Sequence, residues 1–180
     1  MIESPLSSLH RTVWLALLAA LIAAGAFIYV PVGPVPMTLQ IYFVLLAGLI
    51  LGPVYGGLAV LLYILAGAVG LPVFSGGRAG FAHLLGPTGG FLLGFVLSAI
   101  ICGVAGAGRN LPIPVLLLCV LAALGVTYVL GTLRLASMLD MEMSAAASAA
   151  VAPFIAGDLV KAVAAAVSYR FLLARRLLPQ

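Results

Sequence analysis

The chain has 180 residues, of which 8 are Lys+Arg and 4 are Asp+Glu; these charged residues make up 7% of the sequence, against about 25% in soluble domains. Hydrophobic residues make up 65%, and 21 glycines come in addition. This composition excludes a soluble globule, which needs more polar surface, and a disordered chain, which needs low hydrophobicity and high charge.

We therefore expect an all-α integral membrane protein, and its length limits the number of crossings. About 20 helical residues cross the hydrocarbon layer, so six crossings leave about 60 residues for loops and termini. Residues 1–180 are therefore expected to form a single transmembrane domain. The net charge of +4 would indicate a nucleic-acid partner in a soluble protein, but here the basic residues lie at the ends of apolar runs, so we expect no nucleic acid. Cys102 and Cys119 lie within apolar runs, with no disulfide or metal-site spacing.

The first apolar run, residues 13–30, follows Arg11 and predicts the first helix. A basic residue before such a run is also typical of a secretory signal peptide. Alanines recur at every fourth position in two rows: Ala16, Ala20 and Ala24, and Ala19 and Ala23. Small residues at this spacing allow a second helix to approach closely, either within this protein or on a partner.

Proline and glycine then divide the chain. Three prolines predict a loop at residues 31–36, and the apolar run 37–70 is too long for one crossing unless it turns at Gly52 and Pro53. Residues 71–87 predict a long glycine-rich loop. Further helices are expected at 88–107 and 115–135, joined by the connection 109–114. After a loop with Asp140 and Glu142, the small-residue segment 144–152 leads to Pro153 and a last helix that ends near residue 173.

The distribution of arginines favours six helices with both termini in the cytoplasm. In that topology the cytoplasmic side receives Arg11, Arg109, Arg170, Arg175 and Arg176. The outer side receives only Arg78 and Arg134, as the positive-inside rule requires. Five crossings would place Arg109 and the C-terminal arginines outside. The long loops then lie on the outer side, which predicts an outward-facing ligand site, because irregular backbone near a membrane has to be buried or line a cavity.

Asp158 and Lys161 are the strongest candidates for binding. Lys161 is the only lysine in the chain, and the spacing of three residues places both side chains on one face of the last helix. Ionisable groups within a span are costly and usually face a cavity or a partner. Carboxylate and ammonium together suit a small polar ligand with N–H and C=O groups. The alternative is an ion pair that only stabilises the helix.

Weaker candidates begin with Thr38 and Gln40, at the start of the second helix. Gln40 could orient a ligand or make an interhelical contact, and Thr38 could do the same or cap the helix. Arg78 lies in a glycine-rich stretch with Gly77, where a guanidinium and backbone N–H groups could hold a carboxylate or simply be solvated.

A further group of candidates is aromatic or lies near the fourth helix. Tyr42, Tyr63 and Phe74 could line an apolar pocket or belong to the core. Thr88 is expected to cap the fourth helix, and His83 is expected to be structural.

Several motifs of catalysis are absent from the sequence. It contains no Gly-x-x-x-x-Gly-Lys-Ser/Thr loop and no His-Glu-x-x-His motif, and its two histidines make a poor catalytic set. We therefore expect no enzyme activity, no metal and no cofactor. Uphill transport would need another subunit to supply energy.

Four segments, in order along the chain, resemble the BioY family, the biotin-binding S components of energy-coupling-factor (ECF) transporters. They are VPMTLQ (35–40), AGLILGPVYGGLAVLLYILAGAVGLPVFSGG (47–77), LLGPTGGFLLGF (84–95) and PFIAGDLVKA (153–162). The resemblance implies six helices, an outward-facing pocket under the loop between helices three and four, and a role for Asp158 and Lys161 in holding the ureido ring of biotin. It also implies that the alanine rows of helix one dock a transmembrane T subunit, which works with ABC-type ATPase subunits in a bacterial or archaeal cytoplasmic membrane.

The sequence thus predicts high-affinity biotin binding and uptake. The candidate substrate-binding residues are Thr38, Gln40, Tyr42, Phe74, Gly77, Arg78, Thr88, Asp158 and Lys161. Two alternatives remain: an S component or small carrier for another vitamin, and an integral membrane enzyme.

Overall fold

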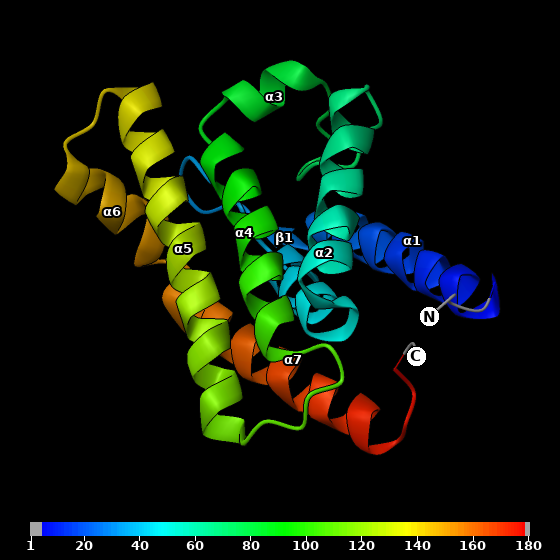
Figure 1. The fold of residues 1–180 in the computed structure, drawn as a ribbon. Helices are drawn as coiled ribbons and strands as arrows, with labels where there is room; N and C mark the ends of the chain where they lie inside the picture. Colours follow the sequence, from blue (N-terminus) through cyan, green and yellow to red (C-terminus); the bar gives the residue numbers. More distant parts are fainter. Residues whose placement is uncertain (1–4, 179–180) are drawn as a thin grey trace.

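The structure is a computed structural model that describes residues 5–178, and it is helical apart from one short β pair (Figure 1). Its helices are α1 (Pro5–Phe27), α2 (Gln40–Ala68), α3 (Phe81–Leu85), α4 (Gly89–Ala105), α5 (Ile113–Leu139), α6 (Met143–Val151) and α7 (Ile155–Ala174). The strands are β1 (Tyr29–Val30) and β2 (Met37–Thr38). The predicted all-α fold class is confirmed at this level.

The proline-rich loop after α1 is confirmed, but it is held by a β pair that the sequence did not predict. Tyr29 pairs with Thr38, and Val30 pairs with Met37, in antiparallel register. The first helix therefore ends before residue 30, and the second begins at Gln40. The physical reason is that prolines 31–36 cannot continue either helix, so the chain reverses direction and pairs its flanking residues.

The predicted turn at Gly52 and Pro53 is confirmed. Gly52 has φ 80° and ψ 179° within α2, a conformation that favours glycine. The two halves of α2 fold back on each other, because a Cβ added to Gly56 would lie 2.7 Å from the Cα of Gly48. In a straight helix, residues eight apart are about 12 Å apart. Residues 40–51 and 53–68 are each shorter than the roughly 20 residues of a full crossing.

The central helix is α4, which packs against α2 on one side and α5 on the other. At Gly94 the backbones of α4 and α5 approach closely, since an added Cβ would lie 2.7 Å from the Cα of Thr127. The main core cluster draws buried residues from α1, α2, α4, α5 and α7. This close packing fixes the faces of α2, α4 and α5 that meet beneath the loops.

The last two helices, α6 and α7, meet at a bend of 51° beside Pro153. Proline lacks the N–H group that a continuous helix needs, which explains the break. The bend brings the first turn of α7, with Asp158, under the loops. Helix α7 then runs along α2 and α5.

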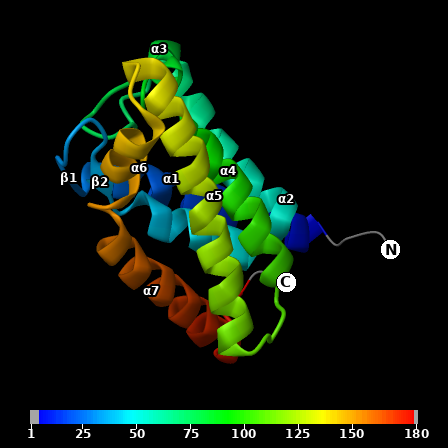
Figure 2. The same cartoon turned by 90° about the vertical axis from the view of Figure 1, so that its left-hand side faces the viewer.

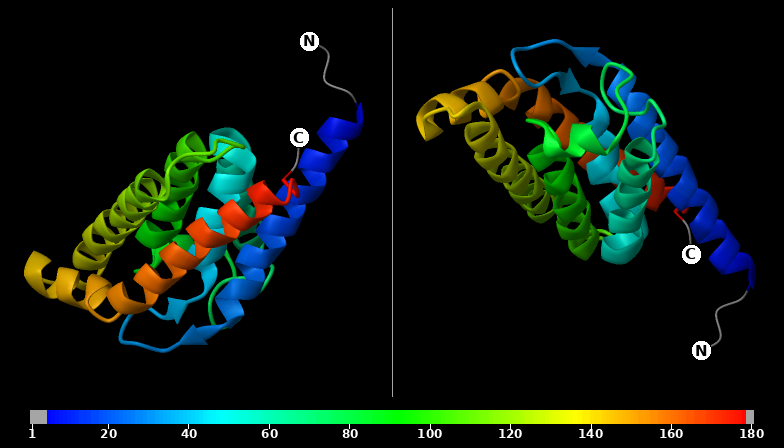
Figure 3. Two further views of the ribbon diagram at one scale, coloured as in Figure 1. Left: turned by 90° about the horizontal axis from the view of Figure 1, so that it is seen from below. Right: turned by 90° about the horizontal axis from the view of Figure 1, so that it is seen from above.

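The loops around residues 31–38 and 71–87 lie at one end of the molecule, and the start of α1 and the end of α7 lie toward the other (Figures 1 and 2). Figure 2 shows α3, α6 and the β pair toward one end, with the α4–α5 connection toward the other. The start of α1 and the end of α7 lie toward this second end (Figures 1 and 3). Arg11 shares a groove there with Gly52 and Gly108, and Arg170 donates to the Leu111 carbonyl. Arg11 and Arg170, which the sequence assigned to one side of the membrane, thus lie toward the same end of the molecule.

Three helices of the described chain are long and apolar enough to cross a membrane by themselves, namely α1, α2 and α5. The bent pair of α6 and α7 would make a fourth, and α4 is a shorter apolar helix. Helix α2 counts once by length although it is folded at Gly52. The structure is that of a multi-pass membrane protein, and the number of six crossings stays a prediction.

The two alanine rows of α1 differ in exposure. Ala16, Ala20 and Ala24 are exposed, whereas Ala19 is only 6% exposed and belongs to the core, and Ala23 is half-buried. Ala19 therefore packs internally and does not present a docking surface. Because Leu18 and Ile22 are also fully buried in the core, α1 is an integral part of the packed domain.

Candidate functional site

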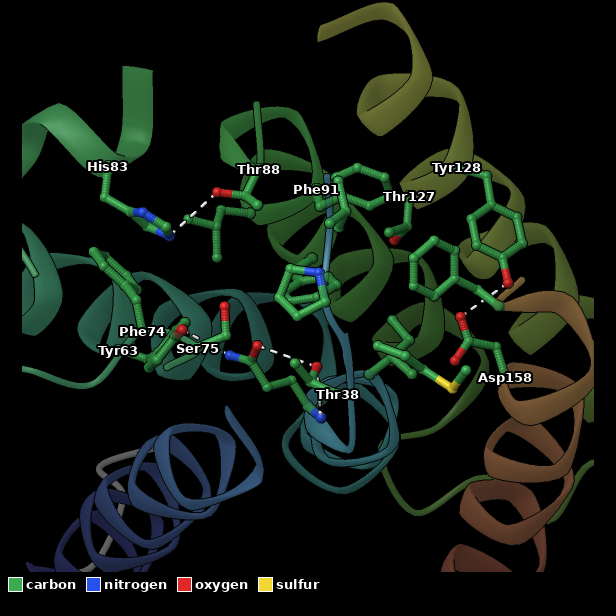
Figure 4. A pocket seen from close by; sticks show the side chains of 18 residues that line it. Thr38, Tyr63, Phe74, Ser75, His83, Thr88, Phe91, Thr127, Tyr128 and Asp158 are labelled. Carbon is green, nitrogen blue, oxygen red and sulfur yellow. Dashed lines mark hydrogen bonds between the residues drawn. The ribbon is translucent and has the colours of Figure 1, made fainter. Parts of the chain in front are cut away.

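A cavity lies beneath the loops, between the β pair, α3 and the helices below them (Figure 4). Its empty space, including the open mouth, is about 600 Å³, but only about 60 Å³ is open to the centre of a water molecule. The cavity is therefore narrow. Most of its wall is apolar, and the lining includes Met37, Ile41, Phe91, Leu92, Phe95 and Phe154. Polar side chains lie at separate places along it, so the cavity suits a ligand with an apolar body.

The polar end of the cavity nearest α7 is built around Asp158. This residue is 7% exposed and stands in the first turn of α7, where the helix dipole favours a carboxylate. Its Oδ1 accepts a hydrogen bond from Lys161 Nζ at 2.7 Å, and its Oδ2 accepts one from the Tyr128 hydroxyl at 2.9 Å. Lys161 Nζ also donates to the Thr38 carbonyl at 2.7 Å. The ion pair is thus held from β2 and from α5.

A second hydrogen-bonded group extends from this end along α2. The Thr38 hydroxyl donates to Gln40 Oε1 at 3.2 Å and accepts from the Gln40 backbone N–H at 3.3 Å. Gln40 Nε2 donates to the Tyr63 hydroxyl at 2.6 Å. Gln40 is 4% exposed, so its amide is fixed within the protein. Tyr63, Gln40 and Thr38 thereby connect both halves of α2 to the ion pair.

The third polar group lies under α3, away from Asp158 (Figure 4). His83 stacks on Phe74, with ring centroids 4.8 Å apart, and its Nε2 shares a hydrogen bond of 3.2 Å with Thr88 Oγ1. Burial, with a smaller contribution from the Arg78 charge, lowers the pKa of His83 below its usual value of 6.5. His83 belongs to the short helix α3, outside the predicted crossings. It lines the cavity, although the sequence assigned it a structural role.

The structure brings five of the predicted binding residues to the cavity wall: Thr38, Gln40, Phe74, Thr88 and Asp158. Lys161 lies directly behind this wall, bonded to Asp158 and Thr38. Thr88 occupies the expected N-cap position of α4, but its side chain does not cap the helix, because the hydroxyl bonds to His83 instead.

The remaining predicted residues lie outside the cavity lining. Tyr42 points toward α7, where its hydroxyl shares a hydrogen bond of 2.9 Å with Ser168. Gly77 and Arg78 are exposed in the tight turn after Phe74, and Phe74 N–H donates to the Arg78 carbonyl at 3.0 Å. The turn points both residues to solvent, so their expected contact with a ligand has no support in this geometry.

Sequence reasoning missed Tyr128 and Thr127, which line the cavity from α5. The available signal was weak: both are polar side chains within an apolar helix. Thr127 bonds to Ser98 Oγ at 2.7 Å and so joins α5 to α4, next to the close approach at Gly94. Only the packing of α5 beside α7 shows that Tyr128 meets Asp158.

These features define a multi-pass helical membrane protein with a narrow cavity under its loops and an ion pair at one end of that cavity. Residues 2–178 match the family model described as the BioY family, and the chain belongs to this family.

The relatives and the fold agree with this assignment. The chain is 44% identical to the "Probable biotin transporter BioY" of Pyrococcus horikoshii, over 84% of this chain and 89% of the relative. It is 41% identical to the "Biotin transporter BioY" of Thermotoga maritima, over 82% and 86%. A crystal structure of the S-component for biotin from an ECF-type ABC transporter matches with a TM-score of 0.89 and 26% identity, over 94% of both chains.

Proposed function

We propose that this chain is the substrate-binding S component of an ECF transporter and that it binds biotin with high affinity for uptake into the cell. The observation that carries this proposal is the largely buried ion pair of Asp158 and Lys161 at one end of the cavity. Family membership and the biotin S-component fold support it.

The hydrogen-bonding capacity left at this pair matches a cyclic urea. An ammonium group has three donors, and Lys161 uses one on Asp158 and one on Thr38, which leaves one for a ligand carbonyl. A carboxylate has about four acceptor sites, and Asp158 uses two of them. The ureido ring of biotin presents one carbonyl between two N–H groups. In this proposal Lys161 donates to that carbonyl and Asp158 accepts from a neighbouring N–H.

The rest of the cavity suits the rest of the molecule. Its aromatic and aliphatic wall fits the sulfur-containing ring and the alkyl chain of biotin. The carboxylate of that chain would then lie near His83 and Thr88, which form the polar group under α3. Burial lowers the pKa of His83, and the nearby charge of Arg78 lowers it further. The same positive charge favours an anion there.

We also propose six crossings, with both termini in the cytoplasm and the cavity facing outward from a bacterial or archaeal cytoplasmic membrane. The crossings would be α1, the two halves of α2, α4, α5 and α7. The fold-back at Gly52 supports counting α2 twice. The collection of Arg11, Arg109 and Arg170 at one end of the molecule supports the orientation.

The chain is proposed to bind biotin without chemical conversion and to depend on partners for energy. The partners are a transmembrane T subunit and ABC-type ATPase subunits. The exposed alanines Ala16, Ala20 and Ala24 form a shallow face on α1 that suits close contact with a helix of the T subunit.

The test is retention of ligand by the purified protein. The protein is incubated with labelled biotin, thiamine or riboflavin in separate samples, and bound label is measured after gel filtration. We expect stoichiometric biotin and background levels of the other two. If the protein retains thiamine or riboflavin and no biotin, that vitamin is its substrate. If it retains none of the three, the proposed function is wrong.

A further inference from the structure

We propose that Tyr128 is a positioning residue for the ligand. Its hydroxyl orients the Asp158 carboxylate toward the cavity and prevents both carboxylate oxygens from bonding to Lys161. This inference rests on the proposed function, since it concerns how the same site accepts hydrogen bonds from the ureido N–H groups.

The argument begins with the freedom of the Asp158 side chain. The terminal torsion of an aspartate is broad, so a single bond from Lys161 to Oδ1 does not fix the plane of the carboxylate. The second bond, from Tyr128 to Oδ2 at 2.9 Å, comes from a different helix and a different direction. Figure 4 shows Tyr128 descending from α5 onto the Asp158 side chain at the cavity wall. Two bonds from two helices define the carboxylate plane.

The nearby cation makes this second bond important. Lys161 follows Asp158 by three residues on the same helical face, and its ammonium group can approach either carboxylate oxygen. Without the Tyr128 hydroxyl, Oδ2 is free to turn toward Lys161. Both oxygens would then bind the same cation, and the acceptor sites needed by a ligand N–H would be occupied or misdirected. In the ligand-free protein, Lys161 would then occupy both oxygens of Asp158, and the ligand would have to displace one of these bonds before it could bind.

The position of Tyr128 in the cavity supports a role beyond holding helices together. Tyr128 itself lines the cavity, beside Asp158 and the neighbouring Thr127. Tyr42 offers a natural comparison, since its hydroxyl also bonds to a side chain of α7, Ser168, at 2.9 Å, but outside the cavity lining. The substitution Tyr42→Phe is therefore a matched control, because it removes a hydrogen bond from a tyrosine to α7 and leaves the bonds of Asp158 intact.

The experiment measures biotin affinity and thermal stability of Tyr128→Phe and Tyr42→Phe in detergent. We expect Tyr128→Phe to bind biotin about 10- to 100-fold more weakly, the effect of losing a hydrogen bond to a charged group, and Tyr42→Phe to stay within about threefold of wild type. In the Asp158→Asn background, Tyr128→Phe should add less than about threefold, because the group it positions is already neutral.

The outcomes separate this inference from the proposed function. If wild type binds biotin and Tyr128→Phe stays within about threefold of it, Tyr128 does not position Asp158. Equal losses of affinity in Tyr128→Phe and Tyr42→Phe, or a full additive loss in the Asp158→Asn background, would show that the hydroxyl only joins the helices. If wild type binds no biotin, the proposed function itself fails. Tyr128→Met, which also lacks the hydroxyl, repeats the test if the phenylalanine variant does not fold.

Discussion

Replacing Lys161 by methionine should weaken biotin binding severely, because the change removes the cation of the ion pair at the polar end of the cavity. Lys161 Nζ makes two hydrogen bonds of 2.7 Å, to Asp158 Oδ1 and the Thr38 carbonyl, and its side chain is only 13% exposed. Methionine keeps most of the length of the unbranched side chain but offers no donor. Among the described residues 5–178, the buried Asp158 carboxylate then keeps one hydrogen-bond partner, the Tyr128 hydroxyl.

The magnitude follows from this loss. Removing one member of a buried, hydrogen-bonded charge pair costs about 2–5 kcal/mol, which corresponds to roughly 30- to several-thousand-fold in affinity. Asp158→Asn should have a similar effect, since the uncompensated charge is then Lys161. The double variant should lose less than the product of the two single losses, because the two residues act as one unit.

The assay is titration of labelled biotin onto the purified variants, with membrane expression measured in parallel. Arg170→Met removes a cation from the other end of α7, where Arg170 bonds to the Leu111 carbonyl, and Asp140→Asn neutralises an exposed aspartate. Both controls should bind biotin like wild type. The reasoning is refuted if Lys161→Met and Asp158→Asn both bind biotin within about threefold of wild type.

Three further predictions concern other parts of the molecule. Ala20→Trp should abolish co-purification with the T subunit and leave biotin retention intact, whereas Ala19→Trp, at a position 6% exposed, should lower thermal stability by overpacking the core; normal co-purification of Ala20→Trp would place the docking surface elsewhere. Vesicles that contain only this chain should hydrolyse no ATP and should not accumulate biotin above the external concentration, because the sequence lacks a phosphate-binding loop; accumulation would contradict the need for partners. Burial and the charge of Arg78 lower the pKa of His83 from 6.5 in the folded protein, so the unfolded chain binds the proton more readily. The melting temperature of the ligand-free protein should therefore fall as the pH drops from 6.5 through the pKa of His83 in the folded protein. His83→Gln should remove this part of the pH dependence, and an unchanged profile would exclude His83 as its source.

The class of protein and the borders of most helices could be predicted from the amino-acid sequence alone. Scarcity of charge requires a lipid environment whatever the fold, because it is a property of composition. The breaks at residues 31–36, at Gly52 and at Pro153 were predicted because proline and glycine act on the local backbone. The spacing of Asp158 and Lys161 was also sufficient to pair them, since residues three apart on a helix are neighbours in any fold.

Which side chains reach the cavity depends on how distant segments pack together, and the sequence does not reveal this. Tyr128 is 30 positions from Asp158, and Thr38 is 123 positions from Lys161, so neither contact follows from local periodicity. Ala19 and Ala20 are neighbours in sequence, yet one is buried and the other exposed, because the face of α1 that meets the core depends on how α1 packs on α2. The orientation of each helix about its own axis is set by contacts between distant segments, and that orientation selects the residues of the site.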